Sequence, residues 1–268
     1  IKRKEAIMVA KKNTTKEAGG LGIEPLDQYE THVKILGTSP LIYNSMSAKA
    51  QQTLFLGARK KTAAEKKAIK HNPEEEFRDS CYEDGNNGAY LSFPSTGIKR
   101  GMATAALETA GVTKASINRG IYVVGEHINV WGKPYMNMSI VRSSDINRTP
   151  DIRTRAKLPV WCTEVTIRYI YPTFSQKDIL SLVTNAGTLC GLGDWRIEKG
   201  GPMGGYRIAL TKEDFKLWDK IVKEEGETCQ KLSLENPETE AHDKTSLRHY
   251  EDWKERTLER SPIIQDVA

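Results

Sequence analysis

Six glycines fall within eighteen residues of this sequence, in the segment GLGDWRIEKGGPMGGYRI that begins at residue 191. Glycine costs conformational entropy on folding, so a chain uses it where the backbone needs a positive φ or where another group approaches the main chain closely. The interior of a helix or strand does not suit such a density. The segment is therefore predicted to be a loop that is approached closely, either by the chain itself or by a ligand.

The residues on both sides of this loop have the periodicities of a strand, a helix and a second strand. The alternating segment TEVTIRYIYP predicts the first strand, and a helix follows from an N-cap at Ser175 to Gly187. A strand over Tyr206–Leu210 completes half of a ferredoxin-like unit. A strand over Glu30–Leu36, with the helices after it, supplies the other half. We expect an α+β fold with a ferredoxin-like or RNA-recognition-like sheet, helical insertions and flexible termini.

The charge distribution divides the chain into a basic body and an acidic end. The first 215 residues hold 31 Lys and Arg against 22 Asp and Glu, and the remainder hold 9 against 13. A flexible arm is predicted over residues 1–28, the α+β domain over residues 29–225, and an acidic, loosely ordered tail over residues 226–268, in which Leu247–Leu258 is the one candidate helix. A basic body fits a polyanion-binding surface, for which the tail would compete; chance surface variation is the alternative.

The cations of the body gather in three segments. The densest lies in a mostly helical stretch over residues 47–81 and contributes Lys60, Lys61, Lys66 and Lys67. The second lies in a helix predicted over Ile98–Ala110, closed by Gly111, and contributes Lys99 and Arg100. The third contributes Arg148, Arg153, Arg155 and Lys157.

Lysine and arginine side chains supply most contacts to phosphate in nucleic-acid complexes. Arg153, Arg155 and Lys157 fall on one face of any strand there, because strand side chains alternate. The alternatives are a solvated helix face for the lysine cluster and ion pairs for the arginine segment. Asp151 is the one acidic residue nearby in sequence, which weighs against ion pairs; phosphate contact and ion pairing both stay open for the arginine segment.

The glycine loop matches neither of two common phosphate motifs. A dinucleotide fingerprint would need glycine where Arg196 stands, and no GK[ST] closes a Walker A. What remains is bare backbone at Gly191, Gly193, Gly200 and Gly201 with Trp195, Arg196 and Lys199. Cations suit a phosphate backbone and an indole ring suits base stacking. For Trp195 alone, we favour packing in the core. For the loop as a whole, we favour a surface that contacts a ligand.

Three segments, KILGTSPLIYN, RTRAKLPVW and AGTLCGLGDWR, resemble a family of phage and prophage proteins. That family is similar to the RAMP superfamily, which includes the crRNA-binding backbone subunits of CRISPR effector complexes. The resemblance covers about Val33–Leu210 and departs from the family at Ile197, where proline is usual. It implies an RNA-binding sheet whose characteristic glycine-rich loop is formed by Gly191, Gly193, Gly200 and Gly201. It also implies assembly side by side along a strand.

No motif in the sequence indicates a metal, a cofactor or a nucleophile. The four cysteines are scattered and form no CxxC pair, which favours free thiols in a reducing cytoplasm. The sequence has no apolar run near 18 residues, so no membrane span is predicted. A metal-independent ribonuclease would use a histidine as general acid and base, and His127 is the first candidate; a surface or hydrogen-bonded histidine is the alternative.

The function predicted from the sequence is non-enzymatic binding of single-stranded nucleic acid, either RNA or single-stranded DNA. The protein is expected to be phage-encoded, to lie in the cytoplasm of a bacterial host and to form a homo-oligomer or filament along the strand. Two alternatives stay open: a ribonuclease acting through His127, and a phage structural or assembly protein in which the glycine loop joins subunits.

Overall fold

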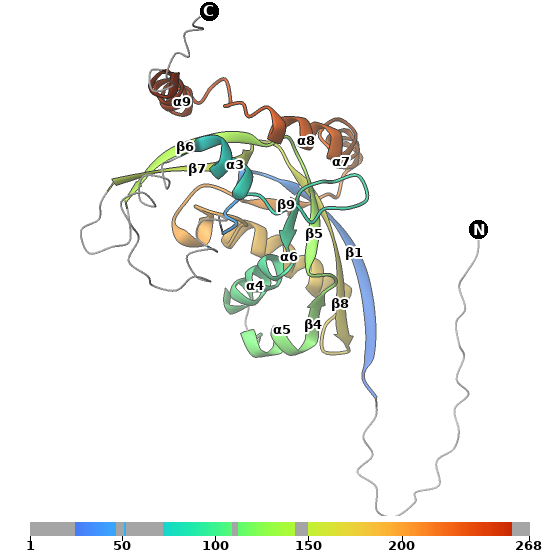
Figure 1. Ribbon diagram of the computed structural model, residues 1–268. Coiled ribbons are helices and arrows are strands. Elements are labelled where there is room, and N and C mark those ends of the chain that lie inside the picture. Colours follow the sequence, from blue (N-terminus) through green and yellow to red (C-terminus); the bar gives the residue numbers. More distant parts are fainter. Residues whose placement is uncertain (1–24, 47–50, 52–71, 109–111, 143–149, 259–268) are drawn as a thin grey trace, which may run out of the picture.

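The computed structural model describes residues 25–46, 51, 72–108, 112–142 and 150–258. Within these ranges the chain forms two antiparallel sheets with helices packed on them, so the predicted α+β class is confirmed (Figure 1). The predicted lysine cluster, Arg148 and the helix end at Gly111 lie outside the described residues.

The larger sheet has the strand order β3-β5-β8-β1-β9, and β4 also pairs with β8. Its strands are β1 (Asp27–Gly37), β3 (Ser92–Pro94), β4 (Ile121–Val123), β5 (His127–Trp131), β8 (Cys162–Tyr171) and β9 (Tyr206–Ile208). The long central pair, β1 and β8, was predicted from alternation of apolar residues. The segment IYVVGEHINVWG forms β4 and β5, which both pair with β8 instead of with each other.

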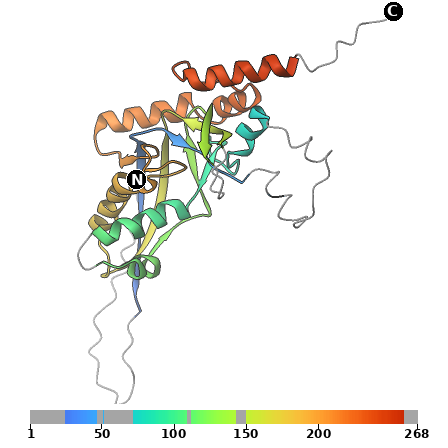
Figure 2. The ribbon, with the colours of Figure 1, turned by 90° about the vertical axis from the view of Figure 1, so that its left-hand side faces the viewer.

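Three helices lie on one face of the larger sheet: α4 (Thr96–Ala105), α5 (Lys114–Gly120) and α6 (Gln176–Leu189). Figure 2 turns this helical face toward the viewer. The helix predicted over Ile98–Ala110 is α4 followed by a short 3₁₀ turn over Ala106–Glu108. On the opposite face, α7 (Lys212–Glu224) covers the end of β1 with the buried Trp218. Capping boxes begin α6 at Ser175 and α7 at Thr211, as helix-start chemistry predicts.

The smaller sheet has the order β2-β7-β6, with β2 (Leu41–Ile42), β6 (Tyr135–Arg142) and β7 (Pro150–Leu158). Helix α3 (Pro73–Asp79) packs on one side of it, and α9 (Lys244–Leu258) lies on the other (Figure 1). Trp161 joins the two sheets: its side chain is fully buried, and its Nε1 donates to the Ser39 carbonyl at 2.8 Å. The indole also fills the space beside Gly37, where a Cβ would overlap the ring.

The loose order predicted beyond Gly226 is wrong for residues 227–258. That segment forms α8 (Glu227–Glu235) and α9, of which only the second was anticipated. The decisive residue in α8 is Gln230, which is fully buried. Its Oε1 accepts from the Tyr90 and Leu91 amides at 2.8 and 3.1 Å, and its Nε2 donates to the Val130 carbonyl at 2.8 Å. One glutamine therefore satisfies buried backbone groups of two distant segments.

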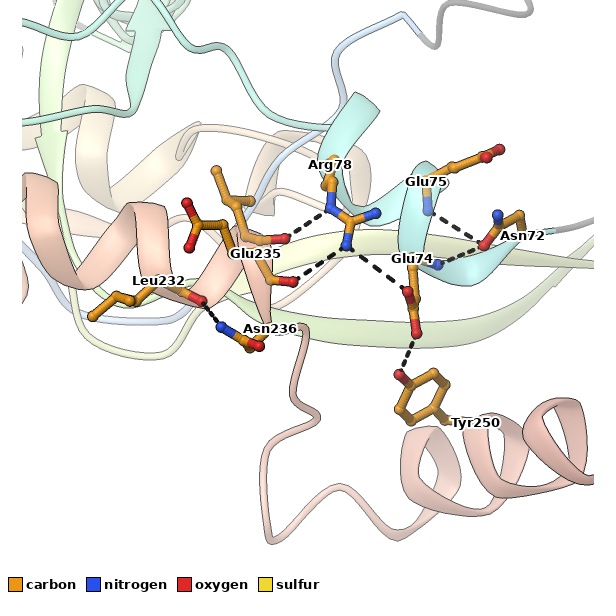
Figure 3. A network of polar contacts seen from close by, with 9 residues as sticks. Asn72, Glu74, Glu75, Arg78, Leu232, Glu235, Asn236 and Tyr250 are labelled. Atoms are coloured by element: carbon orange, nitrogen blue, oxygen red, sulfur yellow. Dashed lines mark hydrogen bonds and ion pairs between the residues drawn. The ribbon is translucent and has the colours of Figure 1, made fainter.

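A polar network ties α3 to both C-terminal helices (Figure 3). Arg78 donates from Nε to the Leu234 carbonyl at 2.8 Å, at the end of α8 where helix carbonyls lack partners and a cation is favourable. From α9, the Tyr250 hydroxyl donates to Glu74 at 2.7 Å, and Glu74 lies 3.8 Å from the Arg78 guanidinium. The acidic end of the chain is thus packed onto the fold through its own helices.

Gly187 does not end α6, as predicted, but lies inside it. A Cβ at Gly187 would overlap the Tyr206 carbonyl oxygen and ring on β9. The glycine therefore allows the helix to lie directly against the strand, and the position is determined by a tertiary contact that helix-stop rules do not describe.

Replacing Gly187 with alanine is expected to lower the free energy of unfolding by about 1–3 kcal/mol, because overpacking forces the helix from the sheet. Gly101 in α4 is the matched control: its Cβ would meet its nearest neighbour, Ala186, at an ordinary 3.4 Å. Gly101→Ala should leave stability unchanged or raise it by up to about 1 kcal/mol through helix propensity. Urea denaturation followed by circular dichroism measures both; equal effects would contradict the contact.

Candidate functional site

The glycine loop, residues 190–205, is held by main-chain hydrogen bonds to β2 and to the connection between β1 and β2. The Gly204 amide donates to the Pro40 carbonyl at 2.7 Å, and the Asp194 amide donates to the Ile42 carbonyl at 2.8 Å. In return, Thr38 donates its amide to the Gly205 carbonyl at 2.8 Å. The loop is thus attached near both of its ends to residues that follow β1 in the chain.

Two positions in the loop show why it needs glycine. Gly204 has φ +73°, and a Cβ there would overlap the Leu192 carbonyl within the loop. Gly193 has φ +77°, and its Cβ would overlap the Ile42 carbonyl. Much of the close approach that the sequence predicted is therefore made by the chain itself, which corrects the preference for a ligand surface over the whole loop.

One part of the loop nevertheless faces a pocket of about 210 Å³. From the loop, Gly191, Gly193, Arg196 and Glu198 line it, and Arg100 of α4 lines it from another side. Tyr82 and Phe93 contribute aromatic surface. This pocket, called here the glycine-loop pocket, brings together Arg100, Arg196, Gly191 and Gly193, which the sequence predicted from separate segments.

The two arginines of the pocket have different surroundings. Arg196 donates from Nε and Nη2 to one carboxylate oxygen of Glu198, at 3.0 and 2.7 Å. Arg100 is exposed, and its guanidinium has no hydrogen-bond or ion-pair partner among the described residues. The pocket therefore holds one arginine that is already paired and one that is open to a ligand.

The first turn of α4 adds favourable electrostatics for an anion. Ser95, at the N-cap, does not cap the helix with its side chain; its hydroxyl donates to the Gly125 carbonyl at 2.6 Å instead. No acidic residue lies in the first turn, and Thr96 and Gly97 of that turn line the pocket. Helix N-terminal amides carry partial positive charge, which favours a nearby anion.

Two buried groups lie at or behind the inner wall of the pocket. Burial raises the pKa of the Cys190 thiol, Glu198 raises this pKa further, and Arg196 and Lys114 act in the opposite direction. The buried Tyr206 hydroxyl lies 3.8 Å from the position that a Cβ on Gly101 would take. Within the described residues it has no hydrogen-bond partner, a costly state for a polar atom out of water.

Two of the three predicted cations on β7 are ion-paired, which corrects their prediction as phosphate contacts. Arg155 pairs with Asp194 of the glycine loop, and only 12% of the Arg155 side chain is exposed. Lys157 donates to Glu240, from the segment before α9, at 2.8 Å. Arg153 is exposed on the same strand face. Because their partners come from distant parts of the sequence, counting neighbouring acids near Asp151 misled the prediction.

The remaining predicted residues are spread over the surface. Lys99 donates to the Asn118 carbonyl at 3.2 Å, away from Arg100. Lys199 and Gly200 are exposed at the tip of the loop, beyond the residues that line the pocket. Gly201 packs against Trp195, where a Cβ would overlap the carbonyl.

Trp195 is 57% exposed and has φ +48°, so the preference for core packing is wrong. A bulky residue with positive φ is an uncommon, strained conformation, and such strain is often found at functional sites. The indole stands next to Arg196 in sequence, on the same loop as the pocket residues.

Sequence reasoning missed Tyr82, Phe93 and Glu198 as pocket residues. Glu198 lies two residues from Arg196, a spacing that a search for cation partners within the loop would have noticed. Phe93 reaches the pocket because β3 pairs with β5 and its ring lies against Gly97 of α4, and Tyr82 is held beside it by a bridge to Ser92 of β3. Neither aromatic residue carries a local sequence signal for this position.

His127 begins β5 beside the segment that contributes Tyr82. Its Nδ1 lies 3.7 Å from a carboxylate oxygen of Asp84, and its ring centroid lies 6.0 Å from that of Tyr82. The histidine side chain is 29% exposed. The structure thus gives this histidine an acidic neighbour and places it next to one wall of the glycine-loop pocket.

Among the described residues, no cluster of three or more His, Cys, Asp or Glu is arranged to hold a metal ion. In the same part of the chain, no helix combines the length and apolar character needed to cross a bilayer. Searches against protein-family models and against curated proteins find no match to this chain. The resemblance to phage proteins and to the RAMP superfamily therefore stays a prediction from sequence.

The Arg155–Asp194 pair gives a test of whether the loop is held through β7. Asp194→Asn should lower the free energy of unfolding by about 2 kcal/mol or more, because Arg155 is left largely buried without its counter-charge. The exposed pair of Lys231 and Glu227 on α8 is the control: Glu227→Gln should change stability by less than about 0.5 kcal/mol. Thermal and urea unfolding measure both variants, and equal small effects would contradict a structural role.

Proposed function

We propose that this protein binds single-stranded nucleic acid, RNA or DNA, and that the glycine-loop pocket takes a phosphate group of the strand. The observation that carries this proposal is the meeting of Arg100 and Arg196 in one pocket with the backbone of Gly191 and Gly193. Arginine forks and helix N-termini are among the groups that hold phosphate in nucleic-acid complexes, and the glycines leave room for it beside them.

Aromatic side chains near these cations support a single strand over a duplex. Tyr82 lines the pocket and is partly exposed, and Trp195 is held outward on the same loop. Unpaired bases stack on such rings, whereas the bases of a duplex are stacked on one another and unavailable. Trp195 is accordingly proposed as a stacking platform for a base adjacent to the bound phosphate.

The fold is proposed to be ferredoxin-like. In support, β1 is connected through α4 to β4 and β5, and β8 is connected through α6 to β9. The strand order β5-β8-β1-β9, with antiparallel neighbours, is the arrangement expected of two interleaved β-α-β units. The sequence resemblance to RAMP proteins points the same way and is the sole basis for expecting side-by-side assembly along a strand.

Binding to labelled single strands tests the pocket directly. Arg100→Gln and Arg196→Gln should each weaken affinity about tenfold and make the dependence of log K on log salt shallower by about 0.7, since one phosphate contact is lost. Arg168→Gln is the matched control; Arg168 is an exposed arginine on β8 outside the pocket, ion-paired with Glu30 at 2.9 Å. Fluorescence anisotropy over a salt series measures all three. Unchanged affinity in both pocket variants would refute the proposed site.

A ribonuclease is the second candidate function, and the Asp84–His127 contact supports it. A carboxylate beside Nδ1 orients an imidazole and leaves Nε2 available to accept a proton from a ribose 2′-hydroxyl. If this reading holds, purified protein cleaves labelled RNA without added metal and leaves DNA intact. His127→Ala should abolish cleavage, and Asp84→Asn should slow it at least tenfold. Cleavage that survives His127→Ala, or intact RNA with the unmodified protein, would exclude the ribonuclease.

A further inference from the structure

We infer that the glycine-loop pocket takes a terminal phosphomonoester, the phosphorylated end of a strand, in preference to an internal phosphodiester. This inference rests on the proposed function, because it names which part of a nucleic acid the pocket takes. It is carried by the juxtaposition of Arg100, Arg196 and Glu198 in a pocket that is also lined by buried residues of the protein core.

The charge balance of the pocket favours a doubly charged ligand. Glu198 holds the Nε–Nη2 edge of Arg196 through two hydrogen bonds to a single oxygen, so a phosphate that takes over this edge displaces the carboxylate. A phosphodiester carries one negative charge and cannot neutralise both arginines after the displacement. A phosphomonoester carries close to two negative charges at pH 7, which matches Arg100 and Arg196 together.

The hydrogen-bonding capacity of the two arginines leads to the same preference. Each guanidinium presents five N–H donors in a rigid fork, and the two forks come from different walls, α4 and the loop. An internal diester offers two non-bridging oxygens, whereas a terminal phosphate offers three. With three oxygens the two arginines can each form a paired contact while sharing one acceptor, whereas with two oxygens they must share both.

The shape of the pocket also suits a strand end. Phe93, Cys190 and Leu192 line it and are themselves 9%, 1% and 2% exposed, so these walls belong to the protein core. Behind Gly101 and Cys190 lies the buried Tyr206 hydroxyl. A phosphate inside a continuous strand needs a path in and a path out, whereas a terminal phosphate needs only one opening.

The test compares three oligonucleotides of one sequence and length, with a 5′-phosphate, with a 3′-phosphate, or with neither, on the full-length protein at fixed salt. One phosphorylated form is expected to bind at least tenfold more tightly than the unphosphorylated strand. Arg100→Gln and Arg196→Gln should reduce this preference to within twofold, whereas the control Arg168→Gln should retain it. Glu198→Gln should tighten binding of the unphosphorylated strand several-fold, because the competing carboxylate is gone.

The outcomes separate this inference from the function on which it rests. If all three oligonucleotides bind within twofold and the pocket variants weaken them equally, the pocket takes internal phosphates; the inference is overturned and the proposed function stands. If the preference persists in Arg100→Gln and Arg196→Gln, the end is bound elsewhere and the inference is also overturned. If no strand binds at low salt, both fail.

Discussion

The docking of the glycine loop on β2 and on the connection between β1 and β2 is the contact on which the candidate site depends. Its hydrogen bonds join backbone to backbone, from Gly204 to Pro40 and from Asp194 to Ile42. Side chains contribute little to such contacts. The strength of these backbone hydrogen bonds therefore does not depend on which side chains the loop exposes. Because β1 belongs to the central strand pair of the larger sheet and α4 packs on α6, the docked loop has one position beside α4. The meeting of Arg196 with Arg100 is a consequence of that position.

The glycines of this loop divide between two roles that composition alone does not distinguish. Gly204 and Gly201 allow the chain to approach itself, since a side chain there would overlap a neighbouring carbonyl. Gly191 lines the pocket, and Gly193 has both roles, since it lines the pocket and a Cβ there would overlap the Ile42 carbonyl. A ligand surface and a self-packed turn are therefore built from one segment, with the second holding the first in place.

Periodic patterns predicted the elements of this fold well, and contacts between distant segments were the limit. Strand β8 and helices α6 and α7 follow from alternation, apolar stripes and capping boxes, which are local signals. Gly187 was wrongly predicted to end α6, because a helix-stop rule uses the local sequence alone and does not include the contact with β9. Helix α8 was missed because its key residue, Gln230, is polar, and its burial makes sense only with the Tyr90 and Val130 backbone groups around it. A weakly periodic charged segment can thus be fixed in place by a single well-partnered side chain.

Contacts between distant segments also limited the prediction of the candidate site, because they decide which cation lacks an ion-pair partner. In the sequence, Arg155 and Arg100 look alike, because each lies in a basic segment. In the fold, Arg155 forms an ion pair with Asp194, whereas no described carboxylate forms an ion pair with Arg100. Net charge counts both equally, although a buried ion pair adds little to the field that a ligand meets. Arg196 lies between these cases, since its partner Glu198 belongs to the same loop and can turn away without disturbing the fold. The pocket's selectivity is accordingly governed by how strongly a ligand competes with that one carboxylate.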